Sequence, residues 1–233
     1  MDDGPATQAE ALALLRTAAA NGIATVVATP HCSPRYPTAP EVMAEGVAEM
    51  RAALGAAGIG IALEPGAEVA LEMALQLPDA DLQRLTLAGS RCLLLECPLA
   101  PAVGEAFERC VDDLQRRGYR ILLAHPERSP AFLGRPARLR ALVERGALCS
   151  VTASAVAGAF GSGPHWYSLE LLRDGLVHSL DSDAHDAERR PPAIGPGLEA
   201  ATTAVPAIAT QADWLTTDAP AALLADEPLP PSR

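Results

Sequence analysis

A glycine separates a helix-like segment from a strand-like segment at several places along the chain, and this repeated join limits the possible folds more than any other feature. The joins are Asn21-Gly22-Ile23, Ala57-Gly58-Ile59, Arg117-Gly118-Tyr119, Arg145-Gly146-Ala147 and Asp174-Gly175-Leu176. Glycine is favoured there because the residue that follows a helix often adopts a left-handed backbone conformation. The alternation of helices and strands predicts an α/β protein with a parallel sheet, and it favours a barrel over an open sheet.

The strand-like segments are short and largely apolar, as is typical of strands that are buried on both faces. We expect strands at residues 23–28, 59–63, 91–96, 120–124, 148–152 and 176–180. A length of 233 residues with a hydrophobic content of 49% suits a single α/β barrel. We therefore expect one domain over residues 1–225, followed by a Pro-rich, frayed tail over residues 226–233.

Charge and cysteine content exclude several classes of protein. A net charge of −11 argues against nucleic acid or an anionic membrane as a partner. No apolar stretch is long enough to cross a bilayer, and no G-x-G-x-x-G motif follows the first strand, which argues against a dinucleotide-binding fold. The five cysteines are odd in number and mostly lie in apolar runs. Without a signal-peptide pattern, they indicate reduced, buried thiols in a cytoplasmic protein.

Two potential metal ligands, Asp183 and His185, follow the last expected strand. Side chains alternate along an extended chain, so both are expected on the same side of it. A carboxylate and an imidazole that converge in this way suit a divalent cation such as manganese, iron or zinc. The alternative is an aspartate that caps a turn beside a surface histidine.

Other expected strands also end at histidine or acidic residues, namely His31, Glu68, Glu96 and His125. The carboxyl ends of all strands in a β/α barrel meet at one rim, so these side chains and the Asp183–His185 pair are expected to form one site. So many carboxylates would repel one another unless cations balanced them, which predicts more than one metal ion. Taken singly, Glu96 could be a solvent-exposed strand end and His125 a structural histidine.

Two arginines follow the predicted ligands: Arg128 lies just beyond His125, and Arg190 just beyond His185. A guanidinium group offers a fork of donors that matches phosphate oxygens, although most arginines form surface salt bridges. The dipeptide His31-Cys32 resembles the start of a cysteine-phosphatase loop. That loop requires an arginine at the position that Thr38 occupies here. A thiol nucleophile is therefore not expected.

Several motifs in order along the chain resemble one family. They are Asp2-Asp3-Gly4-Pro5, Ala28-Thr29-Pro30-His31, Pro65-Gly66-Ala67-Glu68-Val69, Leu95-Glu96, Ala124-His125-Pro126-Glu127-Arg128, Ser182-Asp183-Ala184-His185 and Arg190-Pro191-Pro192. Together they resemble the PHP (polymerase and histidinol phosphatase) superfamily, specifically the manganese-dependent tyrosine phosphatases of capsular and exopolysaccharide operons (CpsB/CapC type). The resemblance covers nearly the whole chain.

The resemblance implies a distorted, seven-stranded (β/α)7 TIM-like barrel that holds several metal ions, commonly Mn²⁺, with iron or zinc as alternatives. It implies hydrolysis of phosphotyrosine on a partner tyrosine kinase that controls polysaccharide synthesis and export. By position, the implied metal ligands are Asp3, His31, Glu68, Glu96, His125, Asp183 and His185. Arg128 and Arg190 are implied to hold the phosphoryl group.

One departure from the family leaves alternatives open. Family members carry a strand with His-x-His several residues before the Asp-Asp-Gly motif, whereas this sequence starts at Met1-Asp2-Asp3. We therefore expect the barrel to lack its first strand and two nitrogen ligands, and the sequence to lack a piece of the working enzyme. The alternatives are a small-molecule phosphatase, for example of histidinol phosphate, and an inactive paralogue that only binds the kinase.

Overall fold

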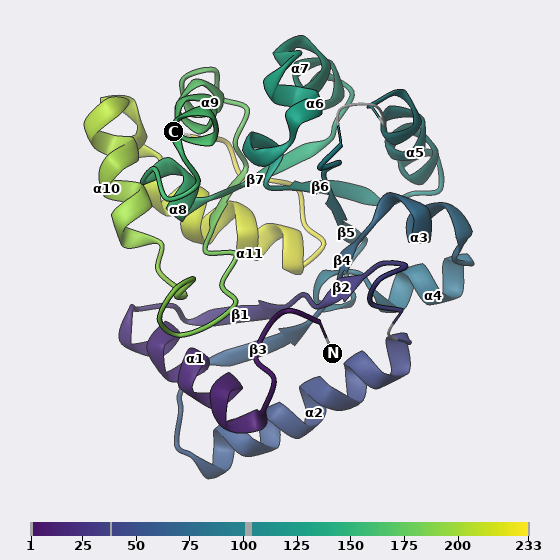
Figure 1. Ribbon diagram of the computed structural model, residues 1–233, viewed down its shortest axis with the longest axis vertical. Helices are drawn as coiled ribbons and strands as arrows, with labels where there is room; N and C mark the ends of the chain where they lie inside the picture. Colours follow the sequence, from purple (N-terminus) through teal and green to yellow (C-terminus); the bar gives the residue numbers. More distant parts are fainter. Residues whose placement is uncertain (1, 38, 101–103, 233) are drawn as a thin grey trace.

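A curved parallel β-sheet forms the centre of the molecule, and helices cover its outer face (Figure 1). The computed structural model describes residues 2–37, 39–100 and 104–232. The strands are β1 Thr25–Ala28, β2 His31–Cys32, β3 Ala62–Pro65, β4 Glu68–Val69, β5 Cys92–Glu96, β6 Arg120–Ala124, β7 Leu148–Thr152 and β8 Ser179–Asp181. All paired strands are parallel, which confirms the predicted α/β class.

The first two strand positions are each interrupted by a short break. β1 pairs with β3, and after the break β2 pairs with β4, with His31 opposite Glu68. Pro30 and Pro65 lie at this break, and proline has no N–H group to donate to the ladder. β2 and β4 then continue into a sheet of order β2-β4-β5-β6-β7-β8. The strand positions therefore follow one another in chain order, as in a β/α barrel.

The glycine joins have the predicted backbone conformation. Gly22, Gly58, Gly118, Gly146 and Gly175 all have positive φ angles, between 63° and 96°. Each follows a helix and turns the chain back toward the sheet. The expected strands at residues 120–124 and 148–152 agree with β6 and β7.

Two strands begin three residues later than predicted because local contacts occupy the backbone groups that a ladder would use. Before β8, the Cys149 N–H donates to Nδ1 of the His178 ring (3.1 Å). The strand therefore starts at Ser179 rather than at residue 176. Before β3, the Ile61 N–H donates to the Ile59 carbonyl (3.1 Å), and pairing starts at Ala62.

The α-helices pack around the sheet. They are α1 Gln8–Ala20, α2 Pro40–Ala56, α3 Leu71–Gln76, α4 Asp79–Arg84, α5 Gly104–Arg116, α6 Pro130–Leu133, α7 Pro136–Glu144, α8 Ala153–Val156, α9 Ser162–Arg173, α10 Gly195–Ala204 and α11 Ala219–Leu224. Shorter turns are η1 Leu87–Gly89, η3 Pro126–Arg128, η4 Pro206–Thr210 and the π-helix η5 Trp214–Asp218. Thr7 and Glu10 cap α1 reciprocally in the predicted capping box.

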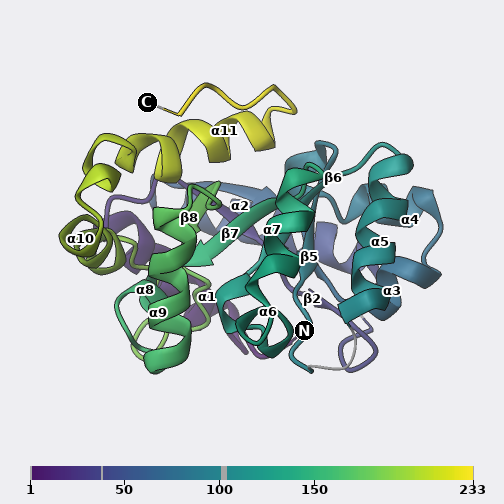
Figure 2. The same cartoon turned by 90° about the horizontal axis from the view of Figure 1, so that it is seen from above.

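The two faces of the sheet pack differently, in accord with the two-residue period of a strand. Leu93, Leu95, Ile121 and Leu123 face the helices and belong to the largest apolar cluster. The alternate residues face the barrel interior, where Cys92, Leu94, Leu122 and Leu148 pack with Leu223 of α11. Helix α11 thus covers one end of the barrel, and the N-terminal segment lies on the opposite side of the molecule (Figure 2).

The sheet stays open between β8 and β1. Within the described ranges, β8 pairs only with β7 and β1 pairs only with β3. Within the described residues the strands therefore do not close into a complete ring.

The predicted fraying of the Pro-rich tail is wrong for the residues that the structure describes. The Trp214 Nε1–H donates to the Pro230 carbonyl (2.8 Å), and Arg120 donates to the Glu227 carbonyl (2.6 Å). Leu229 packs against the interior cluster. The tail is therefore held through its carbonyl oxygens and the Leu229 side chain.

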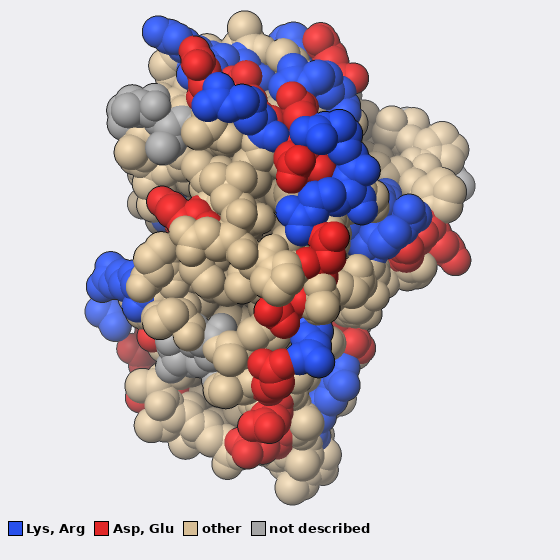
Figure 3. Space-filling model, turned by 90° about the vertical axis from the view of Figure 1, so that its right-hand side faces the viewer, with Lys and Arg blue, Asp and Glu red and all other residues tan. Residues whose placement is uncertain are grey.

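The charged residues of the outer helices form a mixed band on the face shown in Figure 3. Several are paired between α5 and α7, as in the Arg138–Glu108 pair (2.6 Å) and the Arg145–Asp112 pair (3.1 Å). Exposed pairs of this kind contribute little stability each. In the described part of the chain, no helix is both long and apolar enough to cross a membrane.

Candidate metal and phosphate site

The carboxyl ends of the strands converge on one cavity of about 220 Å³. All the residues that the sequence predicted for the site line this cavity. They are Asp3, His31, Glu68, Glu96, His125, Arg128, Asp183, His185 and Arg190. The topology accounts for the convergence, because parallel strands present their carboxyl ends at the same rim.

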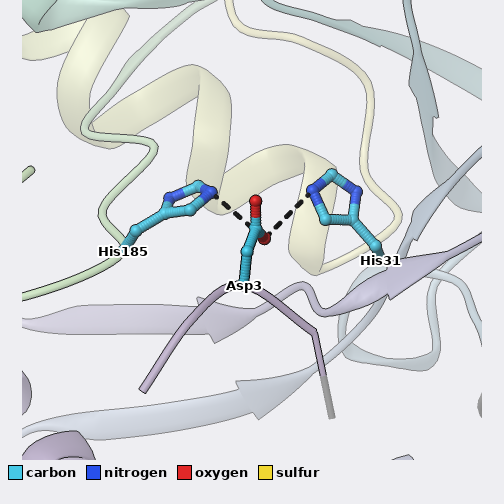
Figure 4. Close-up of side chains that lie close together, drawn as sticks. All are labelled: Asp3, His31 and His185. Atoms are coloured by element: carbon cyan, nitrogen blue, oxygen red, sulfur yellow. Dashed lines mark ion pairs between the residues drawn. The ribbon is translucent and has the colours of Figure 1, made fainter. Parts of the chain in front are cut away.

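Asp3 lies between two histidines at the mouth of the cavity (Figure 4). Its Oδ1 atom lies 3.5 Å from His31 Nε2 and 3.6 Å from His185 Nε2. The neighbouring Asp2 fixes this segment, because its Oδ2 accepts a hydrogen bond from the His31 backbone N–H (2.9 Å). One ligand atom from each of Asp3, His31 and His185 lies within 4.8 Å of the others, which suits a shared cation.

A second group of ligand atoms lies deeper in the cavity. It consists of His31, Glu68 at the start of β4 and Glu96 at the end of β5, again with ligand atoms within 4.8 Å of one another. Burial, and then the nearby charge of Glu68, raise the pKa of Glu96. This repulsion is what a bound cation would relieve. Both groups combine imidazole and carboxylate ligands, a set that fits Mn²⁺, Fe²⁺ or Zn²⁺.

His125 and Glu68 form a buried pair at the base of the cavity. His125 Nε2 lies 2.8 Å from Glu68 Oε1, and each side chain is only 7% exposed. Burial favours neutral histidine, but the hydrogen bond to Glu68 and its charge outweigh burial and raise the pKa of His125 to about 9. Burial likewise acts to raise the pKa of Glu68, yet His125 holds that pKa below its usual value. The pair is therefore ionic in the absence of a cation.

The backbone is strained at two of the predicted ligands. His125 has a φ of 38° and Asp183 a φ of 46°, both in the left-handed region that residues with a side chain rarely adopt. Such strain costs of the order of 1–3 kcal/mol per residue and is concentrated at functional sites.

Asp183 and His185 reach the cavity by a different route from the one predicted. Strand β8 ends at Asp181, so both residues lie in the following loop, and the expectation that strand alternation aligns them is wrong. Instead, Asp183 turns in its left-handed conformation, and His185 Nδ1 lies 3.0 Å from the Asp183 carbonyl oxygen. The strand ends one residue beyond the predicted end at residue 180, because its pairing with β7 continues to Thr152 opposite Asp181.

The two predicted phosphate-binding arginines converge on Asp183. Arg128 Nη1 lies 2.6 Å from Asp183 Oδ2, and Arg190 Nη2 lies 2.5 Å from the same oxygen. The guanidinium groups therefore sit together beside Asp183, and they line the same cavity as the histidine–carboxylate groups. Two adjacent cations that are partly shielded from water form an anion-binding wall.

A buried polar layer lies beneath the cavity, and sequence reasoning did not identify it. Glu127 Oε1 accepts the Thr152 backbone N–H (3.1 Å), and the Ser150 hydroxyl donates to Asp181. Burial, and then the charge of Asp183, raise the pKa of Asp181 to about 7. This layer could have been predicted from Ser150 and Thr152, two polar residues that alternate in an otherwise apolar strand.

Other cavity residues were also missed. Ser33, Arg35 and Tyr36 follow β2, and Leu99 follows β5. The Tyr36 ring stacks on His31 with centroids 5.8 Å apart, and the Arg35 guanidinium carbon lies 5.2 Å from the Tyr36 centroid. The only sequence feature that could have identified these residues as part of the site is their position a few residues beyond a strand end.

The cysteines are all buried within the described residues, and no disulfide joins them there. Burial raises the pKa of Cys32, the thiol beside His31. A raised pKa suppresses the thiolate form that a nucleophile requires.

A parallel β/α barrel with histidines, carboxylates and arginines at its carboxyl rim defines the class of barrel hydrolases that use metal ions. The chain belongs to the CpsB/CapC family of capsular polysaccharide synthesis, whose sequence profile matches residues 1–224.

Named relatives share much of the chain. It is 33% identical to the tyrosine-protein phosphatase YwqE of Bacillus subtilis over 82% of this chain and 75% of that protein. It is 30% identical to the putative tyrosine-protein phosphatase CapC of Staphylococcus aureus, again over 82% and 75% of the two chains.

Solved structures agree with this family. The fold matches a crystal structure from work on YwqE and on CpsB of Streptococcus pneumoniae, described as unique metal-dependent tyrosine phosphatases. The TM-score is 0.80 at 27% identity, with 98% of this chain and 92% of the other covered. A D-hydantoinase structure matches at a TM-score of 0.51 and 14% identity, covering 90% of this chain and 65% of the other, and shows likeness of fold alone.

Proposed function

We propose that this chain is a metal-dependent phosphatase that hydrolyses phosphotyrosine in proteins. One observation carries the proposal: Arg128 and Arg190 line the same cavity as the histidine–carboxylate groups. Family membership and the names of the relatives support the same reaction.

The metal ligands in this proposal are Asp3, His31, Glu68, Glu96, His125, Asp183 and His185, and the metal is Mn²⁺ in more than one position. The two groups of close ligand atoms support five of these ligands, Asp3, His31, Glu68, Glu96 and His185, whereas His125 and Asp183 lie in neither group. The His125 Nδ1 atom, which has no hydrogen-bond partner among the described residues, shows that this ring is held only from its Nε2 side. Bound divalent cations supply Lewis-acid charge to phosphoryl oxygens and make hydroxide available near neutral pH.

The two arginines are proposed to bind and orient the phosphoryl group. Their guanidinium donors lie side by side and partly shielded, with 21% of the Arg128 side chain and 30% of the Arg190 side chain exposed. Positive charge placed in advance where negative charge develops stabilises a transition state more than bulk water does. Asp183 holds both arginines in place.

A phosphotyrosine side chain suits the dimensions of the cavity. A volume of about 220 Å³ is smaller than that of most small-ligand pockets and accommodates one phosphorylated side chain rather than a whole peptide. Leu99 and Arg35 are then available to the flanking residues of a protein substrate. We further propose that the substrate is a tyrosine kinase that regulates capsular or exopolysaccharide synthesis, and that the protein acts in the cytoplasm.

The test measures phosphate release from a phosphotyrosine peptide, a phosphoserine peptide and histidinol phosphate by the Mn²⁺-loaded protein. Metal content is measured in the same samples. We expect the phosphotyrosine peptide to be preferred and Arg128→Ala to act on it less efficiently, mainly through a higher KM. Arg140→Ala is the matched control, because Arg140 pairs with Asp174 on the outer helices.

Two results would contradict the proposal. A preference for histidinol phosphate would indicate a small-molecule phosphatase. Full metal loading without turnover on any of the three substrates would indicate a protein that only binds its partner.

A further inference from the structure

Phe160 touches both arginines of the phosphate-binding wall. The Arg128 guanidinium carbon lies 4.4 Å from the centroid of the Phe160 ring, and the Arg190 carbon lies 5.7 Å from it. Both distances fall within the range in which a cation is attracted to the face of an aromatic ring. No other aromatic ring in the described residues lies over two arginines.

Phe160 is held in place by its loop. It lies in the turn between α8 and α9, where the Ala159 N–H donates to the Ser154 carbonyl (2.9 Å) and the Gly161 N–H to the Gly158 carbonyl (3.1 Å). Gly158 and Gly161 both have φ near 90°. These bonds place a half-buried ring beside the cavity, from a segment that supplies none of the predicted site residues.

The Phe160 ring offsets the repulsion between the two guanidinium groups. Two guanidinium groups meet at one oxygen of Asp183 in a partly shielded position, where like charges repel more strongly than in water. A second carboxylate would offset this repulsion but would also compete with a phosphoryl anion for the same donors. The face of a neutral ring attracts both cations and leaves their N–H donors available.

We propose that Phe160 is a positioning residue that holds Arg128 and Arg190 together as one binding site for a phosphoryl group. The inference rests on the proposed phosphatase function and specifies how its phosphate wall is built. Phe160 does not itself line the cavity, so it acts through the arginines rather than on the substrate. The requirement is for an aromatic face at this position, not merely for apolar bulk.

The experiment compares Phe160→Leu, which keeps apolar bulk but removes the ring face, with Phe160→Tyr, which keeps the face. Trp166→Leu is the matched control, because Trp166 is an exposed aromatic residue on α9 that stacks on Tyr167 away from the cavity. For each Mn²⁺-loaded protein, the dissociation constant for inorganic phosphate is measured by calorimetry. The KM and kcat for an aryl phosphate, the metal content and the melting temperature are measured on the same samples.

We expect Phe160→Leu to weaken phosphate binding and raise KM by about tenfold, from the loss of two cation–ring contacts. Metal content should stay unchanged, and Phe160→Tyr should bind phosphate within about twofold of the wild type. Trp166→Leu should bind as the wild type does.

Three results are decisive. Wild-type phosphate binding in Phe160→Leu would overturn the inference, as would equal losses in the leucine and tyrosine variants, which would indicate a packing role. A wild-type protein without turnover whose phosphate binding still weakens in Phe160→Leu would refute the phosphatase function but support the positioning role.

Discussion

The metal-free protein should lose stability as the pH rises above neutrality, and His125 should be a main cause. Burial alone would lower the pKa of His125, but the hydrogen bond and charge of Glu68 raise it to about 9. In an unfolded chain a histidine titrates near 6.5. The folded state therefore binds a proton that the unfolded state releases. The resulting stability is fully present below about pH 6.5 and is lost as the pH rises through about 9.

The size of the effect follows from these two pKa values. Each pH unit between them removes about 1.4 kcal/mol, so about 2 kcal/mol is lost between pH 7.0 and 8.5. For a chain of this length that corresponds to a fall in melting temperature of about 4–8 °C. His178 and Asp181 contribute little in this window, because burial lowers the pKa of His178 to about 4 and raises that of Asp181 to about 7. The buried cysteines act in the same direction as His125, because burial raises their pKa values whereas a thiol in an unfolded chain titrates near 8.5.

The assay is thermal unfolding of chelator-treated protein at several pH values between 7.0 and 8.5. Glu68→Gln removes the carboxylate that raises the pKa of His125, so its melting temperature should fall clearly less than that of the wild type in this window, and the remaining fall should come from the buried thiols. His178→Gln, a buried histidine elsewhere, should behave as the wild type does. Added Mn²⁺ should reverse the trend, because a ligating histidine must be neutral and metal binding tightens as the pH rises. A flat wild-type profile, or the same fall in Glu68→Gln, would refute the reasoning.

Three further predictions address the chemistry and the packing. Iodoacetamide should leave turnover intact and chelators should abolish it, because all five thiols are buried; the opposite pattern would point to a thiol nucleophile. In steady-state kinetics, Asp183→Ala should reduce kcat by about a hundredfold or more, whereas Arg128→Ala should mainly raise KM for the phosphorylated peptide. The reverse pattern would contradict the roles assigned to these two residues. Gly197→Ala should destabilise the protein by about 1–3 kcal/mol in denaturant unfolding, because the new methyl group would meet the Ala153 carbonyl of α8. Its control, Gly55→Ala, places a methyl group in open space within α2 and should stabilise by about 0.5–1 kcal/mol; equal effects would contradict the packing argument.

The fold class could be predicted from the sequence because the patterns that indicate it are local. A left-handed glycine after a helix and a two-residue apolar period depend on neighbours along the chain, and Gly118 with β6 shows both where they were predicted. Strand starts were predicted less well where a side chain intervened. The His178 ring takes the Cys149 N–H that the ladder would otherwise use, and no local pattern reveals such a contact.

The candidate site could be predicted only in part, for the same physical reason. Residues at strand ends are brought together by topology, so their convergence on one cavity follows from the parallel sheet. Phe160 could not be found in this way, because it lies in a loop and meets Arg128 and Arg190 only through tertiary packing. The left-handed backbone of Asp183 was equally hidden, since it depends on the arginines and the histidine that surround that residue.

The placement of the two ends of the described chain has a practical consequence for attaching labels. Asp2 and Asp3 lie at the mouth of the cavity, whereas residues near Pro230 pack at the other side of the molecule with α11 (Figure 2). A fluorescent label attached beside Asp2 would stand at the approach to the cavity and would disturb the carboxylate that contacts His31 and His185. A label attached beside Pro230 would leave that approach clear, so surface immobilisation through this region would present the cavity outward to a partner in solution.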